Sequence, residues 1–185
     1  MNMLEKLRDS LKDCAVVDIN GYPYFIHPIT DGIPSMDPTL LDEIADAVEK
    51  TGTMGANLIV TPEAMGIQIA AAVSLRTRIP YSVIRKRKYS LPDEIRMSQH
   101  TGYSKTEMYM NGVKRGDRVL ILDDVLSTGG TMRSIINAAR SVGAEIVGAI
   151  VVFGKGDPES IENELGIPII TLLNVKVVDK GVVIC

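Results

Sequence analysis

The chain has 185 residues, of which 45% are hydrophobic, and its formal net charge at pH 7 is -3. This length fits one domain, residues 1 to 185, with enough apolar side chains for a core. The charge excludes a general attraction to nucleic acid or anionic membranes, and no apolar stretch reaches the roughly 18 residues that span a bilayer. Two cysteines at opposite ends, Cys14 and Cys185, lack metal-ligand spacing, which favours a reducing compartment, the cytoplasm, over a disulfide scaffold.

The N-terminal part of the chain predicts two helices on either side of an irregular segment. Leucines recur at helical spacing among charged side chains within residues 1 to 14, which indicates an amphipathic helix and not a signal peptide. Residues 14 to 36 mix Gly and Pro with aromatic side chains and are expected to form an irregular flap. Asp37 followed by Pro38 predicts the start of a helix that ends near Lys50.

Apolar strands alternate with helical patterns through the rest of the chain. Strands are expected at 57 to 61, 81 to 85, 119 to 122, 145 to 153 and 167 to 173. Helices are expected over 66 to 76, over 130 to 142 and from Asp157, and a terminal hairpin over 174 to 185. Buried strands that alternate with helices imply an α/β fold, a mostly parallel sheet flanked by helices.

Ligands in such folds bind at the carboxyl ends of the strands, and the stretch VLILDDVLSTGGTM at 119 to 132 places an unusual loop there. Small residues before a helix N-terminus let backbone N–H groups converge where the helix dipole favours an anion. The run from Ser127 to Thr131 therefore suits a phosphate monoester. Asp123 and Asp124 would repel that phosphate, but they can accept hydrogen bonds from hydroxyls or help to hold a hydrated Mg²⁺. Together these features describe a ribose 5-phosphate.

Other interpretations of these residues remain open. A strand that ends in two solvated acids before an ordinary Gly-Gly turn would give the same pattern. A P-loop NTPase is disfavoured because the sequence contains no G-x-x-x-x-G-K-[ST] motif. The G-x-G at 154 to 156 lacks a third glycine and precedes Pro158, which disfavours a dinucleotide site.

The stretch at 119 to 132 resembles the phosphoribosyl pyrophosphate (PRPP) signature of type I phosphoribosyltransferases: four apolar residues, two acids, two variable positions and a T-G-x-T loop. The similarity extends over nearly the whole chain and is closest to the purine enzymes, especially archaeal hypoxanthine/guanine, bacterial xanthine and adenine phosphoribosyltransferases. It implies that Asp123 and Asp124 are the catalytic acids. The implied 5-phosphate site consists of Ser127, Thr128, Gly129, Gly130 and Thr131.

The turn PEAMG at 62 to 66 resembles the pyrophosphate loop of that family, which implies contacts from Glu63, Ala64, Met65 and Gly66. The run RKRK at 85 to 88 resembles the R-K-x-K sequence beside the active site, so Arg85 and Lys86 are implied as pyrophosphate ligands, for which cations are suited. An ordinary turn and a solvated basic face or oligomer contact are the alternatives.

Two further segments resemble the movable parts of the purine enzymes. Residues 86 to 113 resemble the flexible hood that closes over PRPP and excludes water, with Tyr103, Ser104 and Lys105 as candidates. Residues 1 to 36 correspond to an N-terminal helix and a small base lid, in which Phe25 would stack on the purine. A core position for Phe25 is the alternative.

Lys155, in VVFGKGDP, resembles the lysine that meets the exocyclic oxygen in 6-oxopurine enzymes. An ammonium only donates hydrogen bonds, so it favours the O6 acceptor of hypoxanthine, guanine or xanthine over the amino group of adenine. An exposed loop lysine is the alternative. Many hypoxanthine/guanine enzymes have an aspartate where this chain has Ser127, so the sequence identifies no general base.

The resemblance implies a purine salvage enzyme, a pentosyltransferase that converts PRPP and hypoxanthine or guanine into IMP or GMP and pyrophosphate. It also implies Mg²⁺ as cofactor and a homodimer, with no metal ligand certain and no nucleic acid or membrane partner. An adenine or xanthine enzyme and a non-catalytic PRPP-sensing regulator of the same fold are the alternatives.

Overall fold

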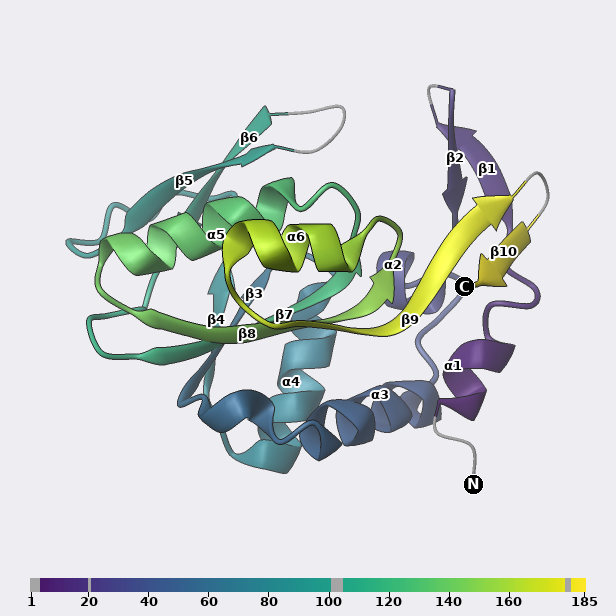
Figure 1. Cartoon of the computed structure of the whole chain (residues 1–185), viewed down its shortest axis with the longest axis horizontal. Helices are drawn as coiled ribbons and strands as arrows, with labels where there is room; N and C mark the ends of the chain where they lie inside the picture. The colour runs from purple at the N-terminus through teal and green to yellow at the C-terminus, as the bar shows by residue number, and fades with distance from the viewer. Residues whose placement is uncertain (1–3, 20, 101–104, 179–180) are drawn as a thin grey trace.

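The computed structural model describes residues 4–19, 21–100, 105–178 and 181–185, which form an α/β fold around a central sheet (Figure 1). Its strands are β3 (Leu58–Pro62), β4 (Tyr81–Ile84), β7 (Arg118–Leu126), β8 (Glu145–Gly154), β9 (Ile169–Val178) and β10 (Gly181–Ile184). They lie in the order β10-β9-β8-β7-β3-β4, and every neighbouring pair is parallel except β9 and β10. The mostly parallel sheet and the terminal hairpin expected from the sequence are confirmed.

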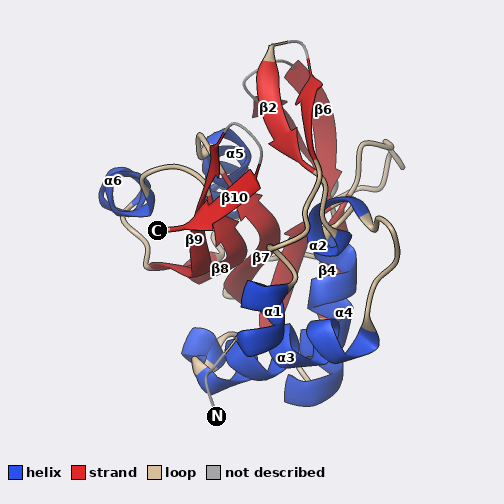
Figure 2. Cartoon of the chain, turned by 90° about the vertical axis from the view of Figure 1, so that its right-hand side faces the viewer, coloured by secondary structure: helices blue, strands red, loops and turns tan. Residues whose placement is uncertain are grey.

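Helices cover both faces of this sheet because its strands are apolar on both sides. Helices α3 (Pro38–Lys50) and α4 (Gly66–Thr77) pack on one face, and α5 (Gly130–Ser141) and α6 (Pro158–Leu165) on the other (Figure 2). Successive residues of β7 divide between the two cores: Ile121 belongs to the α5 side, and Leu120 and Leu122 to the α3 and α4 side. The flanking helices predicted from the sequence are thereby confirmed.

The N-terminal segment is more regular than the sequence predicts. Helix α1 is short (Glu5–Asp9), and the expected irregular flap contains an antiparallel hairpin of β1 (Val16–Ile19) and β2 (Tyr22–Phe25), followed by α2 (Pro28–Asp31). The expectation of an irregular flap was wrong because four-residue strands are too short to show a clear alternation. A 3-10 turn, Thr53–Gly55, links α3 to the sheet.

The segment 86 to 113 contains a second hairpin, formed by β5 (Ile95–His100) and β6 (Lys105–Met110). Its base is built into the core, because Met97, Met108 and Met110 are buried in the cluster that also holds the inner face of α5. Backbone hydrogen bonds in both directions between Arg85 and Tyr109 tie the hairpin to the end of β4.

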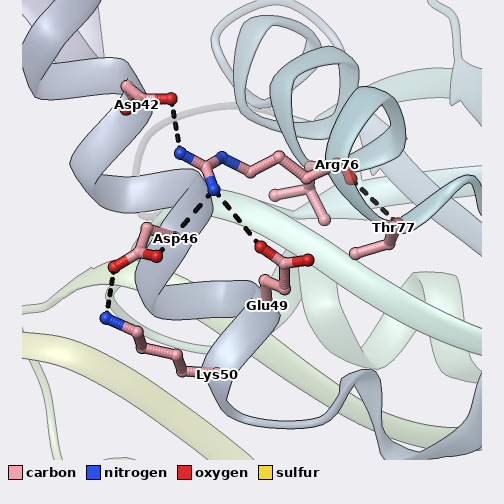
Figure 3. Close-up of polar contacts among 7 residues, drawn as sticks. Asp42, Asp46, Glu49, Lys50, Arg76 and Thr77 are labelled. Carbon is pink, nitrogen blue, oxygen red and sulfur yellow. Dashed lines mark hydrogen bonds and ion pairs between the residues drawn. The ribbon is translucent and has the colours of Figure 1, made fainter.

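One arginine, Arg76, joins the helices α3 and α4 by ion pairs. The guanidinium of Arg76 in α4 lies 2.5 Å from Asp42, 3.8 Å from Asp46 and 3.3 Å from Glu49 of α3 (Figure 3). The three acids recur along one face of α3, where like charges repel when no cation is present. The guanidinium therefore offsets part of the negative charge on this face of α3 and links α4 to α3.

Replacing Arg76 with methionine is expected to lower the melting temperature by a few degrees, and by less in high salt, which screens the unpaired acids. Thermal unfolding at low and high ionic strength measures both effects. The control is Lys12→Met, which removes one exposed ion pair with Asp9 and should leave the melting temperature unchanged. An unaltered melting temperature at low salt in the Arg76 variant would contradict the prediction.

Candidate active site

The acid pair lies within β7. The sequence analysis expected a strand that ends before the two acids, and that expectation was wrong. Strand β8 pairs with β7 as far as Leu126, whereas the described pairing with β3 stops at Ile121. Asp123 and Asp124 therefore sit on a stretch of strand that continues past its pairing with β3. The extension arises because Val125 and Leu126 pair with Phe153 and Gly154 of β8, a contact that the local sequence does not reveal.

Asp123 is buried and Asp124 is half-buried. Asp123 is only 9% exposed, and its Oδ1 accepts the backbone N–H of Asp124 at 2.9 Å. Burial and, next, the negative charge of Asp124 raise the pKa of Asp123 well above its ordinary value. Burial is also the main cause that raises the pKa of Asp124. A cation or a developing positive charge nearby would favour their ionised forms.

The neighbourhood of Asp123 includes the start of α4. A Cβ atom on Gly66 would lie 3.4 Å from Oδ1 of Asp123 and only 2.1 Å from Oγ1 of Thr61, so glycine is required there. The Thr61 hydroxyl is fully buried and has no hydrogen-bond partner among the described residues. No described side chain caps α4, and the backbone N–H of Ile67 in its first turn donates to the carbonyl of Ala64 at 3.3 Å.

Glu63 connects the loop at 62 to 66 with the basic run that follows β4. Its Oε1 accepts the backbone N–H of Lys86 at 2.8 Å, and its Oε2 pairs with Nε of Arg85 at 2.7 Å. The carboxylate of Glu63 thus positions Arg85 and is not itself free to face an anion. Ala64, Arg85 and Lys86 are exposed, and Met65 is half-buried. The Glu63–Ala64 peptide bond is cis.

The loop before α5 has the form of an anion site. Ser127 and Thr128 are exposed, Gly129 adopts a left-handed φ of 74°, and α5 begins at Gly130 without a side-chain cap. A Cβ on Gly129 would approach Ile161 of α6 to 3.0 Å, so the loop packs closely on its neighbour. Thr131 lies in the first turn of α5. The run Ser127 to Thr131 is thus assembled at a helix N-terminus, where an anion is favoured.

A cavity of about 160 Å³ opens next to this loop and is lined by residues from four segments of the chain. Ser127 and Asp124 come from β7 and the loop after it, Lys155 follows β8, and the aromatic residues belong to β2. The lining consists of Tyr22, Tyr24, Phe25, Thr30, Asp124, Val125, Ser127 and Lys155. Ser127 of the candidate phosphate loop and Lys155, the candidate residue for recognition of the base, therefore line one cavity.

Lys155 is half-buried among aromatic rings. Its Nζ lies 4.5 Å from the ring centre of Phe25, 5.1 Å from that of Tyr24 and 5.8 Å from that of Tyr22. Burial lowers the pKa of Lys155, and the charges of Asp31 and Asp124 oppose this shift. The backbone N–H of Lys155 donates to the carbonyl of Leu126 at 2.8 Å, which fixes the loop to β7.

Phe25 has the core position that the sequence left as an alternative. Its side chain is 1% exposed and packs edge to face on Phe153 at 5.6 Å and against His27. Tyr22 and Tyr24 also line the cavity and are more exposed than Phe25, so they offer the larger aromatic surface. The proline after His27 was the signal for the short helix that delivers Thr30 and Asp31, which the sequence analysis missed.

The hood candidates are only partly within the described residues. Tyr103 and Ser104 lie outside them, and Lys105 begins β6 with a side chain that is likewise outside the description. Among the described residues, Glu107 pairs with Arg96 and accepts the hydroxyl of Tyr109 at 2.8 Å. Glu107 is thus engaged within the hairpin.

Metal ligands are few in the described part of the chain. No group of three or more His, Cys, Asp or Glu side chains there could hold a metal ion. Asp123 and Asp124 are two hard oxygen donors whose ionisation a cation would favour, which fits Mg²⁺. They could supply only part of its coordination.

None of the described helices is long and apolar enough to cross a membrane.

The chain is similar to known proteins in sequence and in fold. Residues 40–180 match the family model described as phosphoribosyl transferase domain. The chain is 51% identical over 182 residues to "HGPRTase-like protein 1" of Natrialba magadii, covering 98% of this chain and 96% of that protein. It is 50% identical over 180 residues to a hypoxanthine/guanine phosphoribosyltransferase of Methanohalophilus mahii, covering 97% and 95%. A solved adenine phosphoribosyltransferase of Thermoanaerobacter pseudethanolicus shares the fold with a TM-score of 0.76 at 22% identity, covering 92% of this chain and 99% of that one.

Proposed function

The chain belongs to the phosphoribosyltransferase family, and from this premise we propose that it transfers the phosphoribosyl group of PRPP to hypoxanthine or guanine. The products are IMP or GMP and pyrophosphate. The observation that carries the choice of base is the position of Lys155, whose ammonium lines the same cavity as the loop residue Ser127. The names of the archaeal relatives at about 50% identity support the same choice.

The proposed substrate positions follow the ends of the strands. The 5-phosphate of PRPP lies on the backbone N–H groups between Ser127 and Thr131, at the start of α5. The pyrophosphate lies at the uncapped start of α4, near Gly66, with Arg85 held toward it by Glu63. The ribose then lies between the two, beside Asp123 and Asp124. Lys86 is exposed next to Arg85 and adds a second cation.

Catalysis in this proposal is mainly positioning and charge stabilisation. The transition state of phosphoribosyl transfer has oxocarbenium character at C1 of the ribose, and the carboxylates of Asp123 and Asp124 stabilise that charge. Asp123 and Asp124 would provide part of the coordination of Mg²⁺, which would supply charge neutralisation for the pyrophosphate leaving group. The hood, with Tyr103, Ser104 and Lys105 as candidates, excludes water so that the ribose passes to the base.

Base selection rests on hydrogen-bond polarity. No ion pair of 4.0 Å or less joins Lys155 to a carboxylate among the described residues, so its N–H bonds are available to an acceptor. An O6 atom accepts such a bond, whereas the amino group at the same position of adenine is a donor. Leaving the ammonium unpaired in a half-buried site disfavours adenine.

Further features of the proposal concern organisation. Residues 1–36 act as a helix and base lid and residues 86–113 as a hood, both parts of one domain over residues 1–185. We also propose that the protein works in the cytoplasm as a homodimer, as the family resemblance implies, without nucleic acid or membrane partners. In this proposal Phe25 packs in the core beneath the lid, and the tyrosines of β2 face the purine.

The proposal is tested by nucleotide formation from PRPP and Mg²⁺ with hypoxanthine, guanine, xanthine and adenine in separate reactions. IMP and GMP are the expected products. Turnover of adenine alone would refute the role of Lys155, and turnover of xanthine alone would move the assignment to a xanthine enzyme. PRPP binding without product from any base would identify a regulator of the same fold.

Replacing Lys155 with methionine is expected to lower kcat/KM for hypoxanthine by roughly 10-fold to 100-fold, the range for losing a hydrogen bond from a charged donor. Methionine keeps the apolar stem, so the effect isolates the ammonium. Lys50→Met on α3, which breaks only an exposed pair with Asp46, is the matched control. Equal rates for the Lys155 variant and the wild type would argue against the base reader.

A further inference from the structure

Arg133 of α5 joins the candidate phosphate loop, residues 127 to 131, to helix α6. Its Nε and Nη2 atoms each lie 2.6 Å from an oxygen of Glu164 in α6, which makes a bidentate ion pair. Its third nitrogen, Nη1, donates to the backbone carbonyl of Thr128 in the loop at 3.4 Å. Helix α6 also packs on the loop directly, because a Cβ on Gly129 would lie 3.0 Å from Ile161. The loop is therefore held from the side of α6 as well as by its own backbone.

A cation near the start of a helix is opposed by the helix dipole, so the position of Arg133 calls for a local reason. The hydrogen bond from Arg133 holds the pKa of the Glu164 carboxyl below its ordinary value, and the pair is therefore ionised near neutral pH. Each of the three guanidinium nitrogens has a protein acceptor. These contacts make Arg133 a support of the loop and not a direct ligand of an anion.

The hydrogen bond to Thr128 fixes the direction of an N–H group in the loop. In a trans peptide the C=O and the N–H that follows it point in opposite directions, and the peptide between Thr128 and Gly129 is trans. A Thr128 carbonyl that faces Arg133 therefore turns the N–H of Gly129 away from it. The backbone N–H of Arg133 donates to the carbonyl of Gly129 at 2.8 Å, which likewise turns the N–H of Gly130 away from the helix. Two successive N–H groups are thus oriented as a phosphate requires.

We propose that Arg133, held by Glu164, is a positioning residue for the 5-phosphate subsite of PRPP. The guanidinium keeps the Thr128 carbonyl turned out, so that the N–H of Gly129 faces the phosphate. This inference rests on the proposed function. The pyrophosphate is placed at the start of α4, on a different loop. Loss of the guanidinium therefore weakens the binding of a sugar phosphate and leaves the binding of pyrophosphate unchanged.

The test compares wild type with Arg133→Met, which keeps an apolar stem and removes the guanidinium. In the variant, KM for PRPP is expected to rise roughly 10-fold, the effect of losing one hydrogen bond from a charged donor, while KM for hypoxanthine stays within twofold. Calorimetric titration with ribose 5-phosphate and with pyrophosphate then separates the two subsites. The Kd for ribose 5-phosphate is expected to rise by a similar factor and the Kd for pyrophosphate to stay at the wild-type value, a split that a merely structural role would not produce.

The matched control is Arg140→Met on the same helix. The Nη2 atom of Arg140 also donates to a backbone carbonyl of α6, that of Leu165 at 3.2 Å, but it has no contact with the loop among the described residues. This variant is expected to keep wild-type KM and Kd values. Arg133→Lys keeps the charge without the forked geometry, so its KM for PRPP is expected to remain raised.

The partner acid provides a second arm. Glu164→Ala is expected to raise the Kd for ribose 5-phosphate in the wild-type background and to add little in the Arg133→Met background, because the two side chains act as a unit. An unchanged Kd for ribose 5-phosphate in Arg133→Met, an equal rise in both Kd values, or full recovery in Arg133→Lys would overturn the role of Arg133. A wild-type enzyme that forms no nucleotide from any base would instead overturn the proposed function, and the two Kd values would still decide the role of Arg133.

Discussion

Replacing Asp123 with asparagine is expected to lower kcat/KM for PRPP by roughly 10²-fold to 10³-fold while making the fold more stable. The loss of activity is of the size found when one preorganised charge-stabilising group is removed. Asparagine keeps the oxygen that accepts the N–H of Asp124 at 2.9 Å, so the geometry of β7 is retained. Steady-state kinetics and thermal unfolding of the same preparation measure the two effects.

The gain in stability follows from the sign of the pKa shift. Burial and the charge of Asp124 raise the pKa of Asp123 in the folded state. A carboxyl with a raised folded pKa contributes most to stability below its unfolded pKa, about 3.9, and this contribution is lost as pH rises through the folded value. The variant does not titrate, so its advantage in melting temperature is expected to vanish near pH 3.5 and to grow toward pH 8.

The exposed residue Asp13 provides the control for this prediction. Asp13→Asn is expected to leave kcat/KM within experimental error of the wild-type value. A lower melting temperature for Asp123→Asn at pH 8 would mean that the carboxylate stabilises the fold, contrary to its burial. Unchanged activity would remove Asp123 from the catalytic site.

Replacing Gly156 with alanine is expected to raise KM for both PRPP and the base and to lower kcat/KM roughly 10²-fold, the cost of a displacement of about 1 Å at a catalytic site. A Cβ at this position would lie 2.4 Å from the backbone carbonyl oxygen of Ser127. A backbone atom cannot rotate away, so the loop that carries Lys155 must separate from the phosphate loop. The backbone conformation of Gly156 itself is open to alanine, so the effect is steric.

Gly181 in β10 is the matched control, since a Cβ there would meet no atom within 4 Å. Gly181→Ala is expected to keep wild-type kinetics, and both variants are expected to fold, as circular dichroism would show. Gly156→Ala activity within twofold of wild type would mean that the two loops are not held in contact during turnover.

Most strands and helices of the central sheet could be predicted because these strands are apolar runs and some of the helices have a clear start signal. Asp37 and Asp157 cap α3 and α6 as their positions before proline indicate. The β1–β2 hairpin and α2 could not be predicted in the same way, because their hydrogen bonds are few and local patterning over four residues is ambiguous.

The residues of the candidate site also differ in how far the sequence alone could predict them. Ser127 to Thr131 and Lys155 could be found from the sequence because each forms a short contiguous motif. Glu63 could be located but its contact could not, since the pairing with Arg85 joins residues on separate loops.

By itself, the sequence determined where most strands and helices of the central sheet follow one another along the chain. It also determined the small phosphate loop and the presence of a lysine suited to an oxygen acceptor. Local periodicity and contiguous motifs are sufficient for those features. Only the tertiary structure decided that β7 continues past Asp123, that Phe25 is buried, and that Asp31 accepts the hydroxyl of Tyr24 beside the cavity. The reason is physical: strand pairing, burial and the electrostatic field at a side chain depend on residues that are distant in the chain and adjacent only after folding.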